Sequence, residues 1–418
     1  MNEHAVHPAV QASPTAATPM AGGRAGSRTV LLVGNYRPSV SVVRSLGRAG
    51  YRVIVGRDEF SSAAEYSRWA AETWTHPSLR QDGEGFVRAI ADFLRRRPDV
   101  GFLFPVLGLA IIRVCEHRHL LPEDVVVVTP DPALVAMCDH KTRLLELAAE
   151  LGVPQPGRAV VRDLPALEAA VRQTGYPCIV KPAVAELRLY GEKGVICRSA
   201  QEFRGRFPTW PEGHESLLVQ RYVKGLRHNL HFAAKDGRLL RCLDAVSLRT
   251  MRPDGTGLTV EGISVELPLD MRRYCERMIA AMRYTGIGCL QFLRDEASGE
   301  AVFLEVNPRL AAGYAISQHC GLDLPQLALD LARGAPVPEL AGPFTYPAGQ
   351  RFAWFAGDLE GLKEALLHRE IGLGAAARWL GTAVRSALRA DMHLTWSRED
   401  PRPALVLYGR MLRRSRRR

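Results

Sequence analysis

Lysine is scarce for so basic a chain. Only six of its 55 basic residues are lysines, at positions 141, 181, 193, 224, 235 and 363, and the other 49 are arginines. Six of those arginines fall within the last nine residues, RMLRRSRRR, so the formal charge of +11 falls to +5 for the rest of the chain. Basicity is therefore largely a property of the C-terminal tail, and each lysine elsewhere merits separate attention.

Paired cysteines and long apolar runs are also absent. The eight cysteines stand singly, without a CxxC pair or a His/Cys cluster at zinc spacing, which is typical of reduced, buried thiols. No apolar run reaches the roughly 18 residues needed to span a bilayer. The N-terminus lacks a basic region followed by an apolar core. We therefore expect a cytoplasmic protein, and because no basic patch alternates with stacking aromatics, we expect no nucleic-acid partner.

Length and composition allow two or three domains, since the chain has 418 residues and 47% of them are apolar. Residues 1–28 are mainly Ala, Pro, Gly and Ser and should form a disordered leader. Over residues 29–136, buried strands alternate with amphipathic helices, which predicts an α/β domain with a small doubly wound parallel sheet. The turn after its first strand lacks a GxGxxG pattern, so we infer no dinucleotide site and expect a structural role.

The segment from Gly286 to Arg309, GIGCLQFLRDEASGEAVFLEVNPR, concentrates the polar chemistry of the chain. Two apolar runs flank a Ser-Gly turn, which predicts a β-hairpin. If Arg294 pairs near Glu300, side chains alternate between two faces, and Leu304 falls on the apolar face. The other face then carries Gln291, Phe303, Glu305 and Asn307.

One acid and two amides near a strand end suit Mg²⁺, or Mn²⁺, which takes hard oxygen ligands and shares phosphate oxygens with a nucleotide. The predicted metal ligands are Gln291, Glu305 and Asn307. The alternative is a strand end whose Glu is solvated and whose Asn-Pro pair caps a turn. The three residues alone do not decide between these interpretations.

Two of the scarce lysines lie where a phosphate could be held. Lys141 is in the first turn of a predicted helix that ends at Gly152, and Lys181 ends a short apolar strand before a proline. A cation at the end of a strand is a common way to hold a phosphate. The alternatives are a solvent-facing helix lysine for Lys141 and a snorkelling edge lysine for Lys181.

Two further segments could enclose a nucleotide. Residues 183–199 are turn-rich and charged, which suggests a flexible flap. Residues 217–240 contain two predicted strands around Lys224-Gly225 and a hairpin at Asp236-Gly237. The backbone between Gln220 and Val223 would then be free to hydrogen-bond an adenine edge.

Taken in order, these segments resemble the ATP-grasp superfamily, most closely its carbamoyl-phosphate-synthetase-like and biotin-carboxylase-like members, over roughly residues 29–335. The resemblance implies a pre-ATP-grasp domain at 29–136, an ATP-grasp domain at 137–336 with a lid near 176–220, and a partly helical extension at 337–418 with a basic tail at 410–418. In the ATP-grasp part the fold class would be α+β.

The resemblance also implies site residues. Lys141 and Lys181 would contact the phosphates of ATP, and Arg309 would meet the transferred group or the substrate, so that Arg309 and Lys181 are the predicted catalytic residues. Hinge and ribose contacts would come from Gln220, Arg221, Val223 and His228. Arg249 and Arg252 lie where the family forms part of the substrate site, although solvated arginines are an equal alternative.

The implied reaction is that of a stand-alone carboxylate–amine ligase: ATP phosphorylates a carboxylate, and an amine or similar nucleophile attacks the acyl phosphate. The hinge has Gln220 where many members carry an acid, and the flap has few glycines. These departures motivate an alternative function as a catalytically reduced nucleotide-binding regulator or a membrane-surface scaffold. A kinase-like variant that stops at a phosphoester also stays open.

The last part of the chain contains a predicted amphipathic helix. Leu373, Ala377, Leu380, Val384 and Leu388 share one face, with arginines opposite. With the basic tail, this helix could contact an anionic membrane. We expect instead that it packs against the enzyme body, and we leave a homodimer open.

Overall fold

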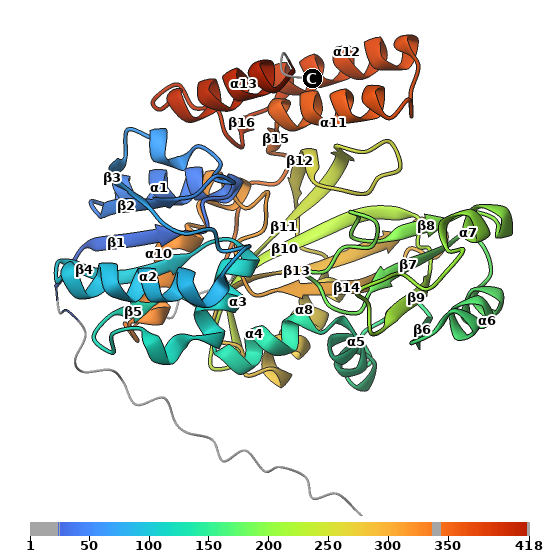
Figure 1. Cartoon of the computed structure of the whole chain (residues 1–418), viewed down its shortest axis with the longest axis horizontal. Coiled ribbons are helices and arrows are strands. Elements are labelled where there is room, and N and C mark those ends of the chain that lie inside the picture. The colour runs from blue at the N-terminus through green and yellow to red at the C-terminus, as the bar shows by residue number, and fades with distance from the viewer. Residues whose placement is uncertain (1–23, 25, 337–343, 416–418) are drawn as a thin grey trace, which may run out of the picture.

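The computed structural model describes residue 24, residues 26–336 and residues 344–415, with side chains described as far as residue 410. Nearly all of the predicted leader, and the last residues of the basic tail, therefore lie outside the described residues. The predicted domain boundaries stay predictions. The architecture is mixed α/β, with three sheets and a group of C-terminal helices (Figure 1).

The first sheet is parallel and has the strand order β3-β2-β1-β4-β5. Its strands are β1 (Thr29–Val33), β2 (Arg52–Arg57), β3 (Ala70–Thr75), β4 (Val100–Pro105) and β5 (Val126–Val127). The alternation predicted for this region is confirmed, while β3 was not predicted because its residues alternate between half-buried and exposed. Such an edge strand gives no continuous apolar run.

Helices cover both faces of this sheet, as the doubly wound pattern predicts. They are α1 (Arg37–Arg48) on one face and α2 (Gly83–Arg96) and α3 (Gly108–Glu116) on the other, whereas α4 (Pro132–Asp139) packs in the core of the second sheet. One core joins β1 and α1 to the middle of the molecule, and another lies under α2 and α3. The order of the strands places β1 and β4 side by side, with the chain leaving in opposite directions from them.

The second sheet has seven strands in the order β14-β13-β10-β11-β12-β15-β16. Its strands are β10 (Gly225–Lys235), β11 (Arg238–Thr250), β12 (Thr259–Val265), β13 (Gly286–Asp295), β14 (Ala301–Asn307), β15 (Arg351–Ala353) and β16 (Met392–His393). A core of buried side chains packs one face of this sheet against α5 (Lys141–Glu150) and α8 (Leu269–Ala281). Two short helices, α9 (Ala315–His319) and α10 (Leu324–Ala332), follow β14.

The third sheet is small and antiparallel, with the order β6-β9-β7-β8. It contains β6 (Arg158–Val161), β7 (Cys178–Pro182), β8 (Val195–Cys197) and β9 (Leu217–Arg221), with α6 (Leu164–Thr174) and α7 (Ala200–Arg206) on one side. It extends from the second sheet at the side opposite the first sheet (Figure 1).

The C-terminal helices α11 (Phe355–Leu367), α12 (Leu373–Arg389) and α13 (Arg402–Ser415) lie together along one side of the molecule (Figure 1). The expectation that the leucine face of α12 packs inward is wrong: Leu373 is 84% exposed and Leu388 is 82% exposed. The helix packs through small residues instead, Ala376, Ala383 and Ser386. None of the described helices is long and apolar enough to cross a membrane.

Candidate active site

A cavity of about 1300 Å³ lies where the three sheets and the C-terminal helices meet. Its walls come from the loops after β1 and β4, from the polar face of the second sheet, from the strands of the third sheet, and from Trp354 and Trp379 of the C-terminal part. The loops at the strand ends of the first sheet therefore face the C-terminal part of the chain across this cavity.

The β13–β14 hairpin forms the floor of this cavity. Its predicted turn is confirmed, since the Asp295 N–H donates to the Glu300 carbonyl at 2.9 Å. The predicted faces need one correction, because the register shifts between the pairs Gln291–Glu305 and Phe292–Phe303. This bulge turns Phe303 into the core and leaves Leu304 in the cavity wall.

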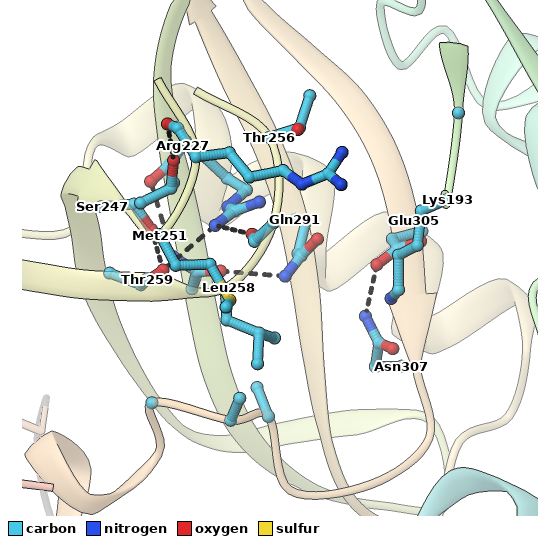
Figure 2. A pocket seen from close by; sticks show the side chains of 18 of the residues that line it. Lys193, Arg227, Ser247, Met251, Thr256, Leu258, Thr259, Gln291, Glu305 and Asn307 are labelled. Atoms are coloured by element: carbon cyan, nitrogen blue, oxygen red, sulfur yellow. Dashed lines mark hydrogen bonds between the residues drawn. The ribbon is translucent and has the colours of Figure 1, made fainter. Parts of the chain in front are cut away.

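The predicted metal ligands are brought together on the cavity side of the hairpin (Figure 2). Asn307 Nδ2 donates to Glu305 Oε1 at 2.9 Å, and Gln291 Nε2 donates to Asn229 Oδ1 at 2.9 Å. Both amides thus have their nitrogens engaged, which leaves their oxygens and the second Glu305 oxygen available. Among the described residues, no group of three or more His, Cys, Asp or Glu side chains could hold a metal, and Glu305 is the single carboxylate of the predicted ligand set.

Three lysines line the cavity with Glu305, and the charges of all three act on it. Lys141 is buried, and its Nζ donates to the Pro182 carbonyl at 3.0 Å, so the solvent-facing alternative is excluded. Lys181 is held in β7, where a Cβ on Gly194 would lie only 2.8 Å from the Lys181 Cγ. Lys193 of the predicted flap lies near Glu305 in the cavity (Figure 2), and its charge acts on that carboxylate. Half of the six lysines in the chain therefore act on one acid.

The charges of this cluster are strongly coupled. Burial alone would raise the pKa of Glu305, but Lys193, the hydrogen bond from Asn307, Lys141 and Lys181 outweigh it and lower the pKa to about 2. Burial lowers the pKa of Lys141 to about 8, despite the opposing effect of Glu305, and burial also lowers the pKa of Lys181. Several cations thus share one carboxylate, which leaves an excess of positive charge.

The hinge between β9 and β10 lines the cavity as predicted, through Gln220, Arg221 and Val223. Gln220 is buried. The Arg221 N–H already donates to the Gly157 carbonyl at 3.1 Å, so an adenine contact at this residue would have to use the Arg221 carbonyl. The Arg221 side chain lies 3.1 Å from Asp295 in an ion pair across the hairpin turn.

His228 does not line the cavity, contrary to its predicted ribose contact. Strand alternation in β10 directs Arg227, Asn229 and His231 to the cavity side. His228 lies on the opposite face, where its Nδ1 and Asp244 Oδ2 form a buried hydrogen bond of 2.6 Å. The family motif pointed to His228, but the face of β10 on which a side chain lies decides what it can contact.

The two candidate substrate arginines differ in their surroundings. Arg249 donates to Glu261 at 2.6 Å and through both terminal nitrogens to Asp358 at 2.8 and 3.0 Å. Its guanidinium thus joins β11 to the C-terminal helices. Because two carboxylates already engage it, Arg249 is a poor candidate for binding a substrate carboxylate. Arg252 lies in an ion pair with Glu192 of the flap at 2.8 Å, which joins the β11–β12 loop to the flap.

Arg309 lies at the end of β14, where it lines both the main cavity and a small adjoining one with Glu305 and Asn307. The small cavity also includes Gly108, the first residue of α3, so Arg309 faces the loop after β4. A Cβ on Gly108 would lie 3.0 Å from Arg309 Nε, which shows how closely the backbone approaches this side chain.

Sequence reasoning missed several residues of the cavity wall. Lys193 could have been found from the scarcity of lysine, because it stands among charged flap residues. His231 gave no signal, although burial lowers its pKa to about 4 and its Nδ1 has no hydrogen-bond partner among the described residues. Arg37 and Trp354 gave none either, because they are distant in sequence.

Comparison with known proteins bears on this geometry. A family model described as "ATP-grasp in the biosynthetic pathway with Ter operon" matches residues 214–354, which span β9 to β15 and include the hinge and the hairpin. This chain has an ATP-grasp domain. The resemblance inferred from the sequence is confirmed at the level of the superfamily.

Relatives of the ATP-grasp domain are distant. The carbamoyl phosphate synthase large chain of Neisseria meningitidis is 23% identical over 321 residues, which cover 72% of this chain but only 29% of that protein. Biotin carboxylase from Campylobacter jejuni, solved as a β-γ-ATP complex, has a TM-score of 0.61 at 15% identity and covers 78% of this chain and 74% of its own. An L-amino acid ligase from Bacillus licheniformis has a TM-score of 0.56 at 14% identity, with 73% and 74% covered. These likenesses establish a shared fold.

Proposed function

We propose that the chain is an ATP-dependent ligase that activates a carboxylate as an acyl phosphate and joins it to an amine or similar nucleophile. One observation carries the proposal: Lys141, Lys181 and Lys193 line one large cavity together with Glu305, a buried carboxylate whose pKa their charges lower. Cations that exceed their counter-charges favour an anionic ligand. A nucleoside triphosphate bound along the ATP-grasp hinge would supply that charge.

The donor set beside the lysines fits a hard divalent cation such as Mg²⁺ or Mn²⁺. Gln291, Glu305 and Asn307 each offer an oxygen, and water and phosphate oxygens would complete the shell. A bound Mg²⁺ would neutralise phosphate charge. Because the protein contributes only one carboxylate, metal binding should depend strongly on the nucleotide.

In the proposed reaction, a carboxylate oxygen of the substrate attacks the γ-phosphorus as the bond from phosphorus to ADP breaks. The amine nitrogen then attacks the acyl carbon, phosphate leaves, and the amine loses a proton to solvent. Lys141, Lys181 and Lys193 would hold the phosphate oxygens, and Arg309 would hold the transferred group. The ion pair between Arg252 and Glu192 would keep the flap over the site and exclude water.

The test is ADP release by the purified full chain with ATP, Mg²⁺ and a panel of carboxylates and amines, followed by mass spectrometry of the products. Condensed products and matching amounts of ADP and phosphate are expected. Replacement of Glu305 by glutamine should stop turnover, and ADP release that survives this change would contradict the assignment.

The alternative, a nucleotide-binding regulator with reduced catalysis, is favoured by the lone carboxylate of the metal set and by Gln220 at the hinge. The same assay separates the two functions. Tight ATP binding without any condensed product across the panel would favour the regulator. A membrane role would require vesicle binding through the exposed leucine face of α12, which the wild-type chain and a Leu373→Ser/Leu388→Ser variant would distinguish in flotation with anionic vesicles.

A further inference from the structure

Arg37 is a buried cation with unsatisfied donors. It is the first residue of α1, directly after the loop that follows β1, and it is only 5% exposed. None of its three guanidinium nitrogens has a hydrogen-bond partner among the described residues. Burying such a group without partners is costly, so its retention calls for a reason.

A second buried donor lies beside it. The Arg37 guanidinium stacks 3.8 Å from the centre of the Trp354 ring, and Trp354 Nε1 also lacks a hydrogen-bond partner within the described part of the chain. Both side chains line the main cavity. Their free groups are donors only, so a ligand that satisfies them must present acceptor oxygens.

The location is one where parallel sheets bind ligands. The chain runs outward from β1 to β2 and β3 and returns on the other side to β4, so the carboxyl ends of β1 and β4 mark the point where the strand order reverses. Such points form crevices that hold ligands. The loop that precedes Arg37 closely approaches the loop after β4, since a Cβ on Gly34 would lie 3.0 Å from the Leu107 backbone nitrogen.

Arg37 shares the main cavity with the lysine cluster but is not part of the small adjoining cavity that contains Glu305, Asn307 and Arg309. That small cavity is lined by residues of α3 and α4 and by none of the loop after β1. Arg37 instead adjoins the C-terminal part, through Trp354 and the nearby charge of Glu360. One cation with a neutral donor and an acid close by suits a singly charged group better than a phosphate.

We propose that Arg37 and Trp354 form a subsite for a carboxylate of the substrate, distinct from the carboxylate that ATP would activate. This proposal rests on the proposed ligase function and narrows its substrate class. At least one of the two molecules joined would carry a free carboxylate on an apolar or aromatic body, since Trp354, Phe352 and Met251 belong to one hydrophobic cluster and line the cavity. Compounds in which that carboxylate is an amide would bind poorly.

The experiment measures binding, so it does not depend on turnover. Full-length wild type, saturated with ADP and Mg²⁺, is titrated in thermal-shift and calorimetric assays with the proteinogenic amino acids, their carboxamides, aromatic monocarboxylates with their amides, and inorganic phosphate. At least one free acid should bind at least about 10-fold more tightly than its amide. The Arg37→Met variant should lose that binding by about 30-fold and keep its response to ADP.

Arg68→Met is the matched control, because Arg68 also stacks on a tryptophan, 5.4 Å from the ring centre of Trp69, but does not line the cavity. It should bind the acid as wild type does. A panel in which no acid is preferred to its amide, or an Arg37→Met variant that still binds the acid, would overturn the subsite. Binding of phosphate alone at Arg37 would overturn its assignment to carboxylates. A wild-type chain whose melting temperature does not change with ADP and Mg²⁺ would instead count against the proposed function.

Discussion

The cavity has two cationic ends that are built in different ways. At the hairpin end, three lysines share one ionised carboxylate, and the Asn307 amide donates a hydrogen bond to that carboxylate. At the other end, Arg37 has no hydrogen-bonded counter-charge among the residues that the structure describes, and within the same part of the chain the Nε1 of its stacking partner Trp354 has no acceptor. The first end has one internal counter-charge for its three cations, whereas the second has only the nearby charge of Glu360 and no carboxylate hydrogen-bonded to Arg37 among the described residues. This difference predicts opposite responses to removal of the central charged group.

The largest loss of activity is expected from a change at the hairpin end. Replacing Glu305 by glutamine should lower kcat by about 1000-fold or more, since transition-state charge stabilisation is usually the largest catalytic contribution. It should also lower the melting temperature, because three lysines then lose their shared acid. ADP release and thermal denaturation measure the two effects. Glu296→Gln is the control, because Glu296 lies in the same hairpin turn and pairs with exposed Lys224.

A second prediction tests the role of the lysines. Lys181→Gln should weaken ATP binding by about 10- to 100-fold, because a charge-assisted phosphate contact is lost from a buried strand. Isothermal titration with ATP and Mg²⁺ measures this change. Lys224→Gln, which removes a lysine whose side chain is 77% exposed, should leave the affinity unchanged. Equal ATP affinities for the wild type and both variants would exclude a phosphate-binding role for Lys181.

The third prediction sharpens the contrast in stability. Arg37→Met should leave the unfolding free energy unchanged or raise it by about 1 kcal/mol, because an apolar side chain replaces a buried cation without hydrogen-bond partners. Urea denaturation of the chain without ligands measures it. A clear loss of stability would show that Arg37 stabilises the folded chain. Its role in binding a ligand would then be decided by the binding assay alone.

The smallest effect concerns pH. The lowered pKa of Lys141, about 8, means that the free protein loses this positive charge as pH rises from 7 to 9. Phosphate binding favours the charged form, so ATP affinity should fall by up to about 10-fold over this range. Lys141→Arg should flatten the dependence, because arginine stays protonated. The pKa of Arg37, lowered by burial to about 10, predicts acid binding that is steady over the same range.

Local patterns predicted much of the fold and part of the site. Alternating strands and helices gave the first sheet, apart from the half-exposed strand β3. The hairpin turn and both of its strands were also predicted, because turn residues and apolar runs are local features of the sequence. The β-bulge was not, and it exchanged the positions of Phe303 and Leu304. A bulge depends on how two strands meet, which no single strand specifies.

The sequence alone predicted that Lys141, Lys181, Glu305 and Asn307 belong to one site, because their short motifs resemble those of the ATP-grasp superfamily, and all four line one cavity. Only the tertiary structure decided that His228 turns away from the cavity, that Arg249 is engaged by Asp358, and that Lys193 joins the cluster. It also brought Arg37 against Trp354. Such contacts arise from packing between segments far apart in the chain, and packing leaves no periodic trace in either segment.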